Sequence, residues 1–260
     1  MKRAEVNYQK IIGEIVKFLR NEFKKRNKDK AIVGISGGID SAVTACLCKK
    51  AELDLYGVLM PYKKRGLKQA KEMVKTLNLS KDKVIYLNIT SLVDTQIREI
   101  RQIIKLDKIS TENILPRQRM VVQYAVAHYL NGLVVGTQNL SEHYLGYFTL
   151  YGDQSCDICP IAGLWKTQIY QLAKYLNIPK SIIKKEPSGD LWPGITDEKD
   201  LGFKYKDADK ILYLFLVRRN SKKKIISEYG FTPKLVNRVL ERARITSYKR
   251  EKVPVCYFKK

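Results

Sequence analysis

Short β-branched runs alternate with helical patterns through the first half of this chain, and this alternation restricts the folds available to it. The predicted strands are residues 31–35, 54–60, 83–89 and 132–136. Apolar residues recur at helical spacing in the first 25 or so residues, from 40 to about 50, and through 67–78, 92–104 and 119–130. Strands that alternate with helices predict an α/β fold, a doubly wound and mostly parallel sheet with helices on both faces.

The second half of the chain changes character, because past Gly163 the pattern turns mainly helical. A length of 260 residues and a hydrophobic fraction of 45% are those of a folded globular protein. We therefore expect one domain over residues 1–260, with a nucleotide-binding α/β core at about 28–180 and a mainly helical part at about 181–260.

The sequence carries no signal of a membrane or secreted protein. No run of about 18 apolar residues is present. Glu14 and Lys17 interrupt the apolar stretch near the N-terminus, unlike a secretory signal. Five cysteines, an odd number spread through a long chain, do not resemble a disulfide framework. We expect a cytoplasmic protein without a membrane partner.

The formal net charge of +23 raises the question of a nucleic-acid partner, since Lys and Arg bind phosphate backbones. The basic residues are scattered along the chain. The one dense run, VRRNSKKK at 217–224, has no interleaved aromatic residues for base stacking. A charged surface on a protein with polyanionic substrates accounts equally for the charge. We expect no nucleic-acid partner.

The stretch GISGGIDSAV, residues 34–43, joins the first predicted strand to the helix behind it. A helix N-terminus offers unpaired N–H groups and a partial positive charge, so anions bind there readily. Gly37 and Gly38 allow the backbone to form a nest of N–H groups, and Ser36 and Ser41 add hydroxyl donors. The stretch is therefore predicted to be a phosphate loop, although no lysine follows its glycines.

Asp40 is an unexpected residue in such a loop. A carboxylate beside phosphate is repulsive unless a cation lies between them, and Mg²⁺ would bridge carboxylate and phosphate oxygens. Alternatively, Asp40 is only an N-terminal helix residue favoured by the helix dipole. The first interpretation predicts Mg²⁺ as the cofactor.

In this setting SGGxDS resembles the pyrophosphate loop of the ATP pyrophosphatases, which split ATP into AMP and pyrophosphate while adenylating a substrate. Four later stretches are similar in order and spacing to NAD synthetases: ENILPRQRM (112–120), GTQNLSE (136–142), GYFTLYGD (146–153) and PSGDLWPGITDEKDLG (187–202). With LWKTQIYQLAKYL (164–176) and SYKREKVP (247–254), the resemblance to ammonia-dependent NAD synthetases covers about Tyr8 to Pro254.

That resemblance implies the amidation of deamido-NAD with ammonia, through an acyl-adenylate, to give NAD, AMP and pyrophosphate. It also implies a homodimer with deamido-NAD at the subunit interface. Glutamine-using relatives carry an additional amidase domain, whereas the synthetase resemblance takes up nearly the whole of this chain. We therefore expect no glutaminase domain, and ammonia that is free or supplied by a separate partner.

The resemblance also assigns the ATP and metal sites. ATP would be bound by Gly34, Ile35, Ser36, Gly37, Gly38, Ile39, Asp40, Ser41, Thr137, Lys166 and Ser188. Asp40 and Glu142 would be the magnesium ligands, and Asp40, Lys166 and Ser188 the catalytic residues. Two carboxylates suit a hard cation, and a lysine suits phosphate charge. Ser188 is alternatively a turn residue.

The second substrate would contact a separate group of residues. Deamido-NAD would be bound by Arg117, Leu150, Asp157, Tyr248 and Lys249. Leu150 stands where many members of the family have lysine, Gln154 and Ser155 replace a usual glycine pair, and Tyr248 replaces a common histidine. The departures cluster on the dinucleotide side, so ATP cleavage is predicted more directly than the acceptor. Arg117 is alternatively a surface arginine.

Two other functions remain open at this stage. The CDIC pair, Cys156 and Cys159, in an ATP pyrophosphatase is compatible with tRNA thiolation, although thiolation enzymes usually read SGGKDS. Zinc at this pair would need two further ligands, and small apolar cysteines packed near the substrate loop explain it equally. A non-catalytic nucleotide- or RNA-binding module is the other alternative; it would tolerate Asp40→Asn and release no pyrophosphate.

Overall fold

A parallel four-stranded sheet forms the centre of the α/β core. In the computed structural model, which describes residues 6–188 and 195–258, the strands are β1 (Lys30–Gly34), β2 (Asp54–Leu59), β3 (Val84–Tyr86) and β4 (Leu133–Val134). Their order is β3-β2-β1-β4, and all three pairings are parallel. The predicted α/β class is confirmed. The predicted helix start at residues 1–5 and the motif residues 189–194 lie outside the described residues.

The two edge strands are shorter than the sequence pattern predicts. Residues 83–89 give only three strand residues in β3, and 132–136 give two in β4. Each edge strand pairs with one neighbour only. After β4, Val135 pairs with Ile158 in an isolated parallel bridge. Beyond β3, Leu87 N and Ile89 N still donate to the carbonyls of Leu59 and Pro61, although these residues lie outside the strand.

Both faces of the sheet are buried, which explains the continuous apolar runs. Along β1, Ala31 and Val33 face one apolar cluster and Ile32 faces another, because successive strand side chains point to opposite sides. The first cluster includes residues of α1 (Tyr8–Lys25), α2 (Ile39–Lys50), α3 (Leu67–Thr76), α8 (Lys166–Tyr175) and α9 (Lys180–Ile183). The second includes residues of α4 (Thr90–Arg101) and α6 (Ile114–Tyr129).

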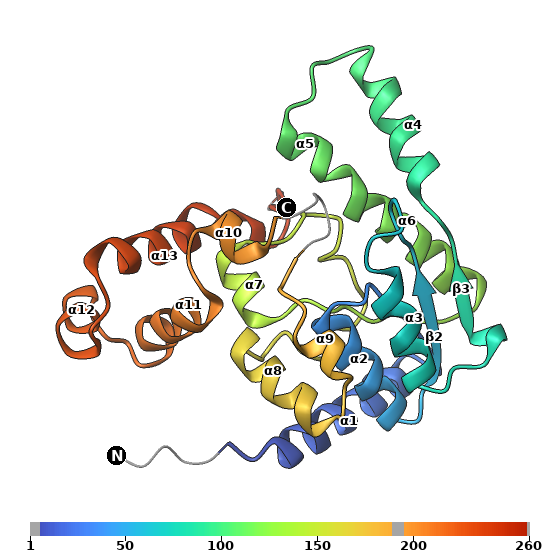
Figure 1. Ribbon diagram of the computed structural model, residues 1–260, viewed down its shortest axis with the longest axis horizontal. Helices are drawn as coiled ribbons and strands as arrows, with labels where there is room; N and C mark the ends of the chain where they lie inside the picture. Colours follow the sequence, from blue (N-terminus) through green and yellow to red (C-terminus); the bar gives the residue numbers. More distant parts are fainter. Residues whose placement is uncertain (1–5, 189–194, 259–260) are drawn as a thin grey trace.

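The C-terminal part is helical, as the sequence predicts, and has an apolar cluster of its own. It comprises α10 (Asp197–Leu201), α11 (Tyr205–Leu212), a π-helical turn (Tyr213–Val217), α12 (Lys222–Tyr229) and α13 (Pro233–Ile245). These helices pack with α7 (Leu140–Leu145), whose Leu145 joins the same cluster. Figure 1 shows them at one side of the molecule, next to α7 and α8.

The remaining elements are short. They are η1 (Lys81–Lys83), α5 (Lys108–Glu112) and η3 (Ser247–Arg250). Figure 1 shows α4 and α5 projecting from the sheet at the edge opposite the C-terminal helices. Among the helices of residues 6–188 and 195–258, none combines the length and apolar composition that a bilayer span requires.

Helix α2 is the central support of the phosphate loop, because it begins where the loop ends and is almost entirely buried. Leu47 on this helix is fully buried in the first apolar cluster. We expect Leu47→Ala to lower the free energy of unfolding by about 2–5 kcal/mol, through lost transfer energy and the cavity left behind. Urea unfolding would measure it.

Lys49→Ala is the matched control, since this lysine lies on the same helix and is exposed. Its effect is expected to stay within about 0.5 kcal/mol. Equal losses in the two variants would contradict the central packing of α2.

Candidate active site

The carboxyl ends of β1, β2 and β4 border a cavity of about 600 Å³. Doubly wound sheets bind their ligands at this edge, and the volume is that of a small-molecule site. Most of the residues predicted to bind ATP or magnesium line it: Gly34, Ile35, Ser36, Gly38, Ile39, Asp40, Ser41, Thr137, Glu142, Lys166 and Ser188. Segments distant in sequence therefore meet in one cavity.

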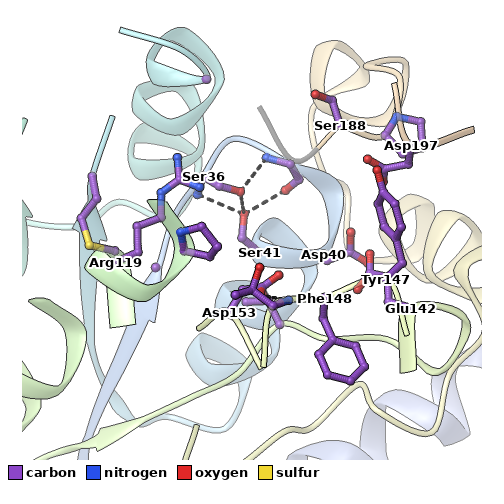
Figure 2. Close-up of a pocket in the computed structure, with 18 of the residues that line it drawn as sticks. Ser36, Asp40, Ser41, Arg119, Glu142, Tyr147, Phe148, Asp153, Ser188 and Asp197 are labelled. Atoms are coloured by element: carbon purple, nitrogen blue, oxygen red, sulfur yellow. Dashed lines mark hydrogen bonds between the residues drawn. The ribbon is translucent and has the colours of Figure 1, made fainter. Parts of the chain in front are cut away.

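The phosphate loop is held by its own serines. Ser41 Oγ donates to the carbonyl of Gly38 at 2.9 Å and lies 3.1 Å from Ser36 Oγ, while Gly38 N donates to Ser36 Oγ at 3.2 Å. Figure 2 shows these bonds. Because helix α2 starts at Ile39, the first N–H groups of the helix follow this loop. The loop is thus preorganised beside a helix N-terminus.

Gly37 is the one loop glycine that does not line the cavity, and it serves packing instead. Its φ is +81°, in the left-handed region that favours glycine. A Cβ at this position would lie 2.5 Å from the carbonyl oxygen of Gly66 and 2.9 Å from the backbone N of Ala70. The loop backbone at Gly37 is therefore in close contact with the first turn of α3.

Lys166 joins the two carboxylates that the sequence pairs in one metal site. Its Nζ lies 2.5 Å from Asp40 Oδ2 and 3.1 Å from Glu142 Oε1. The three side chains come from the first turns of α8, α2 and α7, respectively. Lys166 is 2% exposed, so the ion pairs form away from bulk water. We call this group the Lys166 cluster.

Asn139 completes the cluster, and the sequence analysis missed it. Its Nδ2 donates to Asp40 Oδ1 at 2.9 Å, and its Oδ1 accepts from Glu142 N at 3.0 Å. Glu142 Oε2 accepts in return from Asn139 N at 3.2 Å, which makes a capping box at the start of α7. The spacing N-x-x-E in GTQNLSE is the sequence signature of that box and was available to find it.

A third carboxylate, that of Asp197, acts on the charges of the cluster. Asp197 also lines the cavity, and Figure 2 shows it on the same side as Asp40 and Glu142. Burial raises the pKa of Glu142; Lys166 lowers it, and the charges of Asp40 and Asp197 raise it further. Burial lowers the pKa of Lys166, but these three carboxylates outweigh it and raise that pKa well above its ordinary value. Lys166 is therefore fully charged at neutral pH.

The carboxylate oxygens of Asp40 and Glu142 are of the type that magnesium prefers as ligands. Within residues 6–188 and 195–258, no group of three or more histidine, cysteine or acidic side chains is placed to hold a metal by itself. Magnesium is usually held by only one or two carboxylates, with water and substrate phosphates completing its shell. Asp40 and Glu142 supply such a pair of hard oxygen ligands beside the phosphate loop.

The residues predicted to bind deamido-NAD are only partly brought together. Lys249 lines the cavity, where its Nζ donates to the carbonyls of Gly146 and Phe148 at 2.9 and 2.7 Å. Arg117, Leu150, Asp157 and Tyr248 are absent from the cavity lining. Two of them meet outside it, since Arg117 Nε donates to the carbonyl of Leu150 at 3.3 Å.

Arg119, two positions after Arg117, lines the cavity instead, opposite the carboxylates in Figure 2. Residues two apart on a helix do not face the same side, so only one of the two arginines lines this cavity. Asp157 has a structural contact: its Oδ2 accepts from Val134 N at 2.7 Å, at the end of β4. The roles predicted for Arg117 and Asp157 remain predictions.

The cysteines of CDIC lie behind the wall of the cavity. A Cβ built on Gly136 would lie 2.5 Å from Cys156 Sγ and 3.3 Å from Cys159 Sγ. Cys159 Sγ also lies 3.3 Å from the carbonyl oxygen of Gln138. Both sulfurs thus pack against the segment that carries Thr137, and Gly136 provides the space for them.

Removing the charge of Lys166 should destabilise the fold, because Asp40 and Glu142 would remain buried without their common partner. For Lys166→Met we expect a loss of about 3–5 kcal/mol in the free energy of unfolding. Chemical denaturation is the measurement, with Lys174→Met, an exposed lysine on the same helix, as control. If both variants unfold at the same denaturant concentration, the cluster contributes nothing to stability.

Comparison with known proteins agrees with this geometry. The family model for NAD synthase matches residues 11–253. The NH(3)-dependent NAD(+) synthetase of Fusobacterium nucleatum is 37% identical over 255 residues, which covers 96% of each chain. That of Wolinella succinogenes is 38% identical over 253 residues, again with 96% of each chain covered.

Solved structures give the same family. NMN synthetase from Francisella tularensis superposes with a TM-score of 0.85 at 28% identity, covering 98% of this chain and 100% of that one. The NH3-dependent NAD synthetase from Campylobacter jejuni gives 0.81 at 31% identity, covering 97% and 100%. The resemblance seen in the motifs is confirmed, and the tRNA-thiolation interpretation is set aside. This chain belongs to the NAD synthase family.

Proposed function

We propose that this protein is an ammonia-dependent NAD synthetase, which converts deamido-NAD, ATP and ammonia into NAD, AMP and pyrophosphate. The observation that carries the proposal is the Lys166 cluster, set at the end of a phosphate loop in a chain of this family. The cytoplasm is the proposed location of the reaction.

The chemistry requires activation of a carboxylate. Ammonia cannot displace oxide from a carboxylate at a useful rate, so the oxygen must first become part of a good leaving group. The nicotinate carboxylate attacks the α-phosphorus of ATP and pyrophosphate departs; ammonia then attacks the acyl-adenylate and AMP departs. Positioning and neutralisation of phosphate charge are the contributions expected of the protein, and no side-chain nucleophile is needed.

Each part of the cavity has a role in this scheme. The N–H groups at the start of α2 and the hydroxyls of Ser36 and Ser41 would bind the phosphates that leave as pyrophosphate. Lys166, buried and fully charged, would donate to phosphate oxygens. Asp40 and Glu142 would hold Mg²⁺, which when bound neutralises phosphate charge. Ser188, which also lines the cavity, would contact the triphosphate.

The family resemblance also leads us to propose a homodimer. Exposed apolar side chains occur on α4, α5, α6 and the connection between α4 and α5: Leu92, Ile103, Ile104, Ile109, Val121 and Tyr129. An exposed apolar group of this kind is typical of a protein–protein interface. Arg117 lies on the same helix as Val121, outside the cavity of its own chain, so a dinucleotide bound between subunits would reach it.

A second acceptor is favoured by one comparison. NMN synthetase from Francisella tularensis has a TM-score of 0.85 against this chain. A mononucleotide acceptor, the nicotinic acid form of NMN, would undergo the same adenylation and amidation. Leu150 stands where many relatives have a lysine that touches deamido-NAD, so this chain departs from the family at a position expected to contact the acceptor. The acceptor must therefore be tested directly.

The test is an incubation of the purified protein with Mg-ATP and ammonium, with deamido-NAD and nicotinic acid mononucleotide supplied separately. We expect NAD, AMP and pyrophosphate in equal amounts, and little product when glutamine replaces ammonium. Asp40→Asn should lower the rate at least about 100-fold, because a metal ligand contributes several kcal/mol to stabilisation of the transition state. Chromatography of the nucleotides would measure NAD and AMP, and a phosphate assay after pyrophosphatase treatment would measure pyrophosphate.

Asp29→Asn is the control for this variant, since Asp29 is exposed and outside the cavity. It should retain the full rate. Amidation of the mononucleotide alone would move the assignment to the second acceptor. No cleavage of ATP with either acceptor would refute the proposed enzyme and favour a binding module.

The dimer gives a separate prediction. Ile104→Asp should weaken self-association at least about 10-fold, because a buried charge at an interface lacks compensation. Sedimentation velocity over a range of concentrations would measure this, with Val217→Asp, at an exposed apolar position of the C-terminal part, as control. An unsubstituted protein that sediments as a monomer at all concentrations would contradict the proposal.

A further inference from the structure

Helix α11 supports the Lys166 cluster from the C-terminal part of the chain. Tyr205 and Asp209, four residues apart, lie on one face of this helix. Both are almost fully buried, at 2% and 4% exposure. The contacts of both side chains lead to the cluster.

The carboxylate of Asp209 joins the two helices that carry Lys166 and Glu142. Ser141 Oγ donates to Asp209 Oδ1 at 2.5 Å, and Thr167 N donates to Asp209 Oδ2 at 2.9 Å. Ser141 immediately precedes Glu142, and Thr167 immediately follows Lys166. The buried carboxylate of Asp209 therefore contacts the residue before Glu142 and the residue after Lys166.

A third bond closes this network. Ser141 Oγ accepts from the backbone N of Lys166 at 2.8 Å. The first turns of α7 and α8 are thereby bonded to each other through Ser141 and to α11 through Asp209. Since every donor in the network is occupied, a displacement of Asp209 would displace both first turns.

Tyr205 adds a contact with the charged end of Lys166. The Nζ of Lys166 lies 5.3 Å from the centre of the Tyr205 ring, within the range of a cation–π interaction. The Tyr205 hydroxyl donates to Asp197 Oδ2 at 3.3 Å. One face of α11 thus contacts the backbone N of Thr167 through Asp209 and the ammonium group of Lys166 through Tyr205.

Burial of the charged Asp209 carboxylate costs free energy. Burial raises the pKa of Asp209, whereas the bonds from Ser141 and Thr167 and the charge of Lys166 lower it. An amide of the same shape would avoid burying a charge, but it offers one acceptor atom where Asp209 uses two. Capping of α8 alone would need only one acceptor atom. Holding α7 and α8 in fixed relative positions needs two, one directed at each helix.

We propose that Asp209 is a positioning residue for the reaction: it fixes Lys166 and Glu142 relative to each other and so couples the C-terminal helices to ATP and magnesium binding. Asp209 does not line the cavity, so it would act on the substrates only through the residues of the cluster. The inference rests on the proposed function, in which Lys166 binds phosphate and Glu142 binds magnesium.

The test compares Asp209→Asn with the unsubstituted full-length protein. We expect kcat to fall about 10- to 100-fold, as when an outer partner of a metal ligand is removed. The magnesium concentration for half-maximal rate should rise by a similar factor, while KM for the acceptor changes less than about twofold, because Asp209 acts only through the cluster. A smaller fraction of folded protein would lower kcat, but it would leave the magnesium concentration for half-maximal rate unchanged.

Two further variants distinguish positioning from stability. Ile211→Ala removes a fully buried side chain from the same helix without breaking a bond of the network, and should lower Tm but leave the magnesium dependence unchanged. Ser141→Ala combined with Asp209→Asn should cost little more than Asp209→Asn alone, because both act through one network.

The outcomes separate this inference from the proposed function. If the unsubstituted protein forms product and Asp209→Asn keeps kcat and magnesium dependence within twofold, the positioning role is refuted and the enzyme assignment stands. The positioning role is refuted in the same way if Ile211→Ala, at matched Tm, changes both constants as much as Asp209→Asn does.

If the unsubstituted protein forms no product, calorimetry with magnesium and α,β-methylene-ATP still tests the role. A dissociation constant at least about 10-fold higher in Asp209→Asn supports it. Equal binding, or no binding to the unsubstituted protein, overturns it.

Discussion

The contact of one buried lysine with two carboxylates determines how the rest of this structure is arranged. Lys166 Nζ lies within 3.1 Å of both Asp40 and Glu142, and the three residues lie in the first turns of three different helices. Buried charges are costly unless they are paired and hydrogen-bonded. The relative positions of α2, α7 and α8 are therefore constrained by charge as well as by apolar packing.

Both parts of the chain supply residues at or around this contact. The sheet places Asp40 at the carboxyl end of β1, through the phosphate loop and α2. The C-terminal helices contribute Asp197 to the cavity and Asp209 beneath the first turns of α7 and α8. A site of this kind requires both parts, because neither supplies the carboxylates, the lysine and their outer partners alone.

Much of the fold and of the ATP side was predictable, because local patterns specify them. Short β-branched runs and period-3.6 apolar spacing indicated the parallel sheet and its helices, and the SGGxDS loop indicated a phosphate site. The edge strands β3 and β4 proved shorter than their apolar runs, because an apolar run does not by itself specify where strand pairing ends. Asn139 was missed although its N-x-x-E spacing is visible, because a cap is recognised only once a helix start is placed.

By itself, the sequence determined the fold class, the phosphate loop and the family, because each depends on residues close together in the chain. Only the tertiary structure decided that Lys166 lies between Asp40 and Glu142, 126 and 24 residues away in sequence. It also decided that Arg119, rather than Arg117, lines the cavity, and that Asp209 supports the cluster. These facts depend on how the helices pack. The direction of a side chain across a packed interface cannot be predicted from the spacing of nearby residues in the sequence.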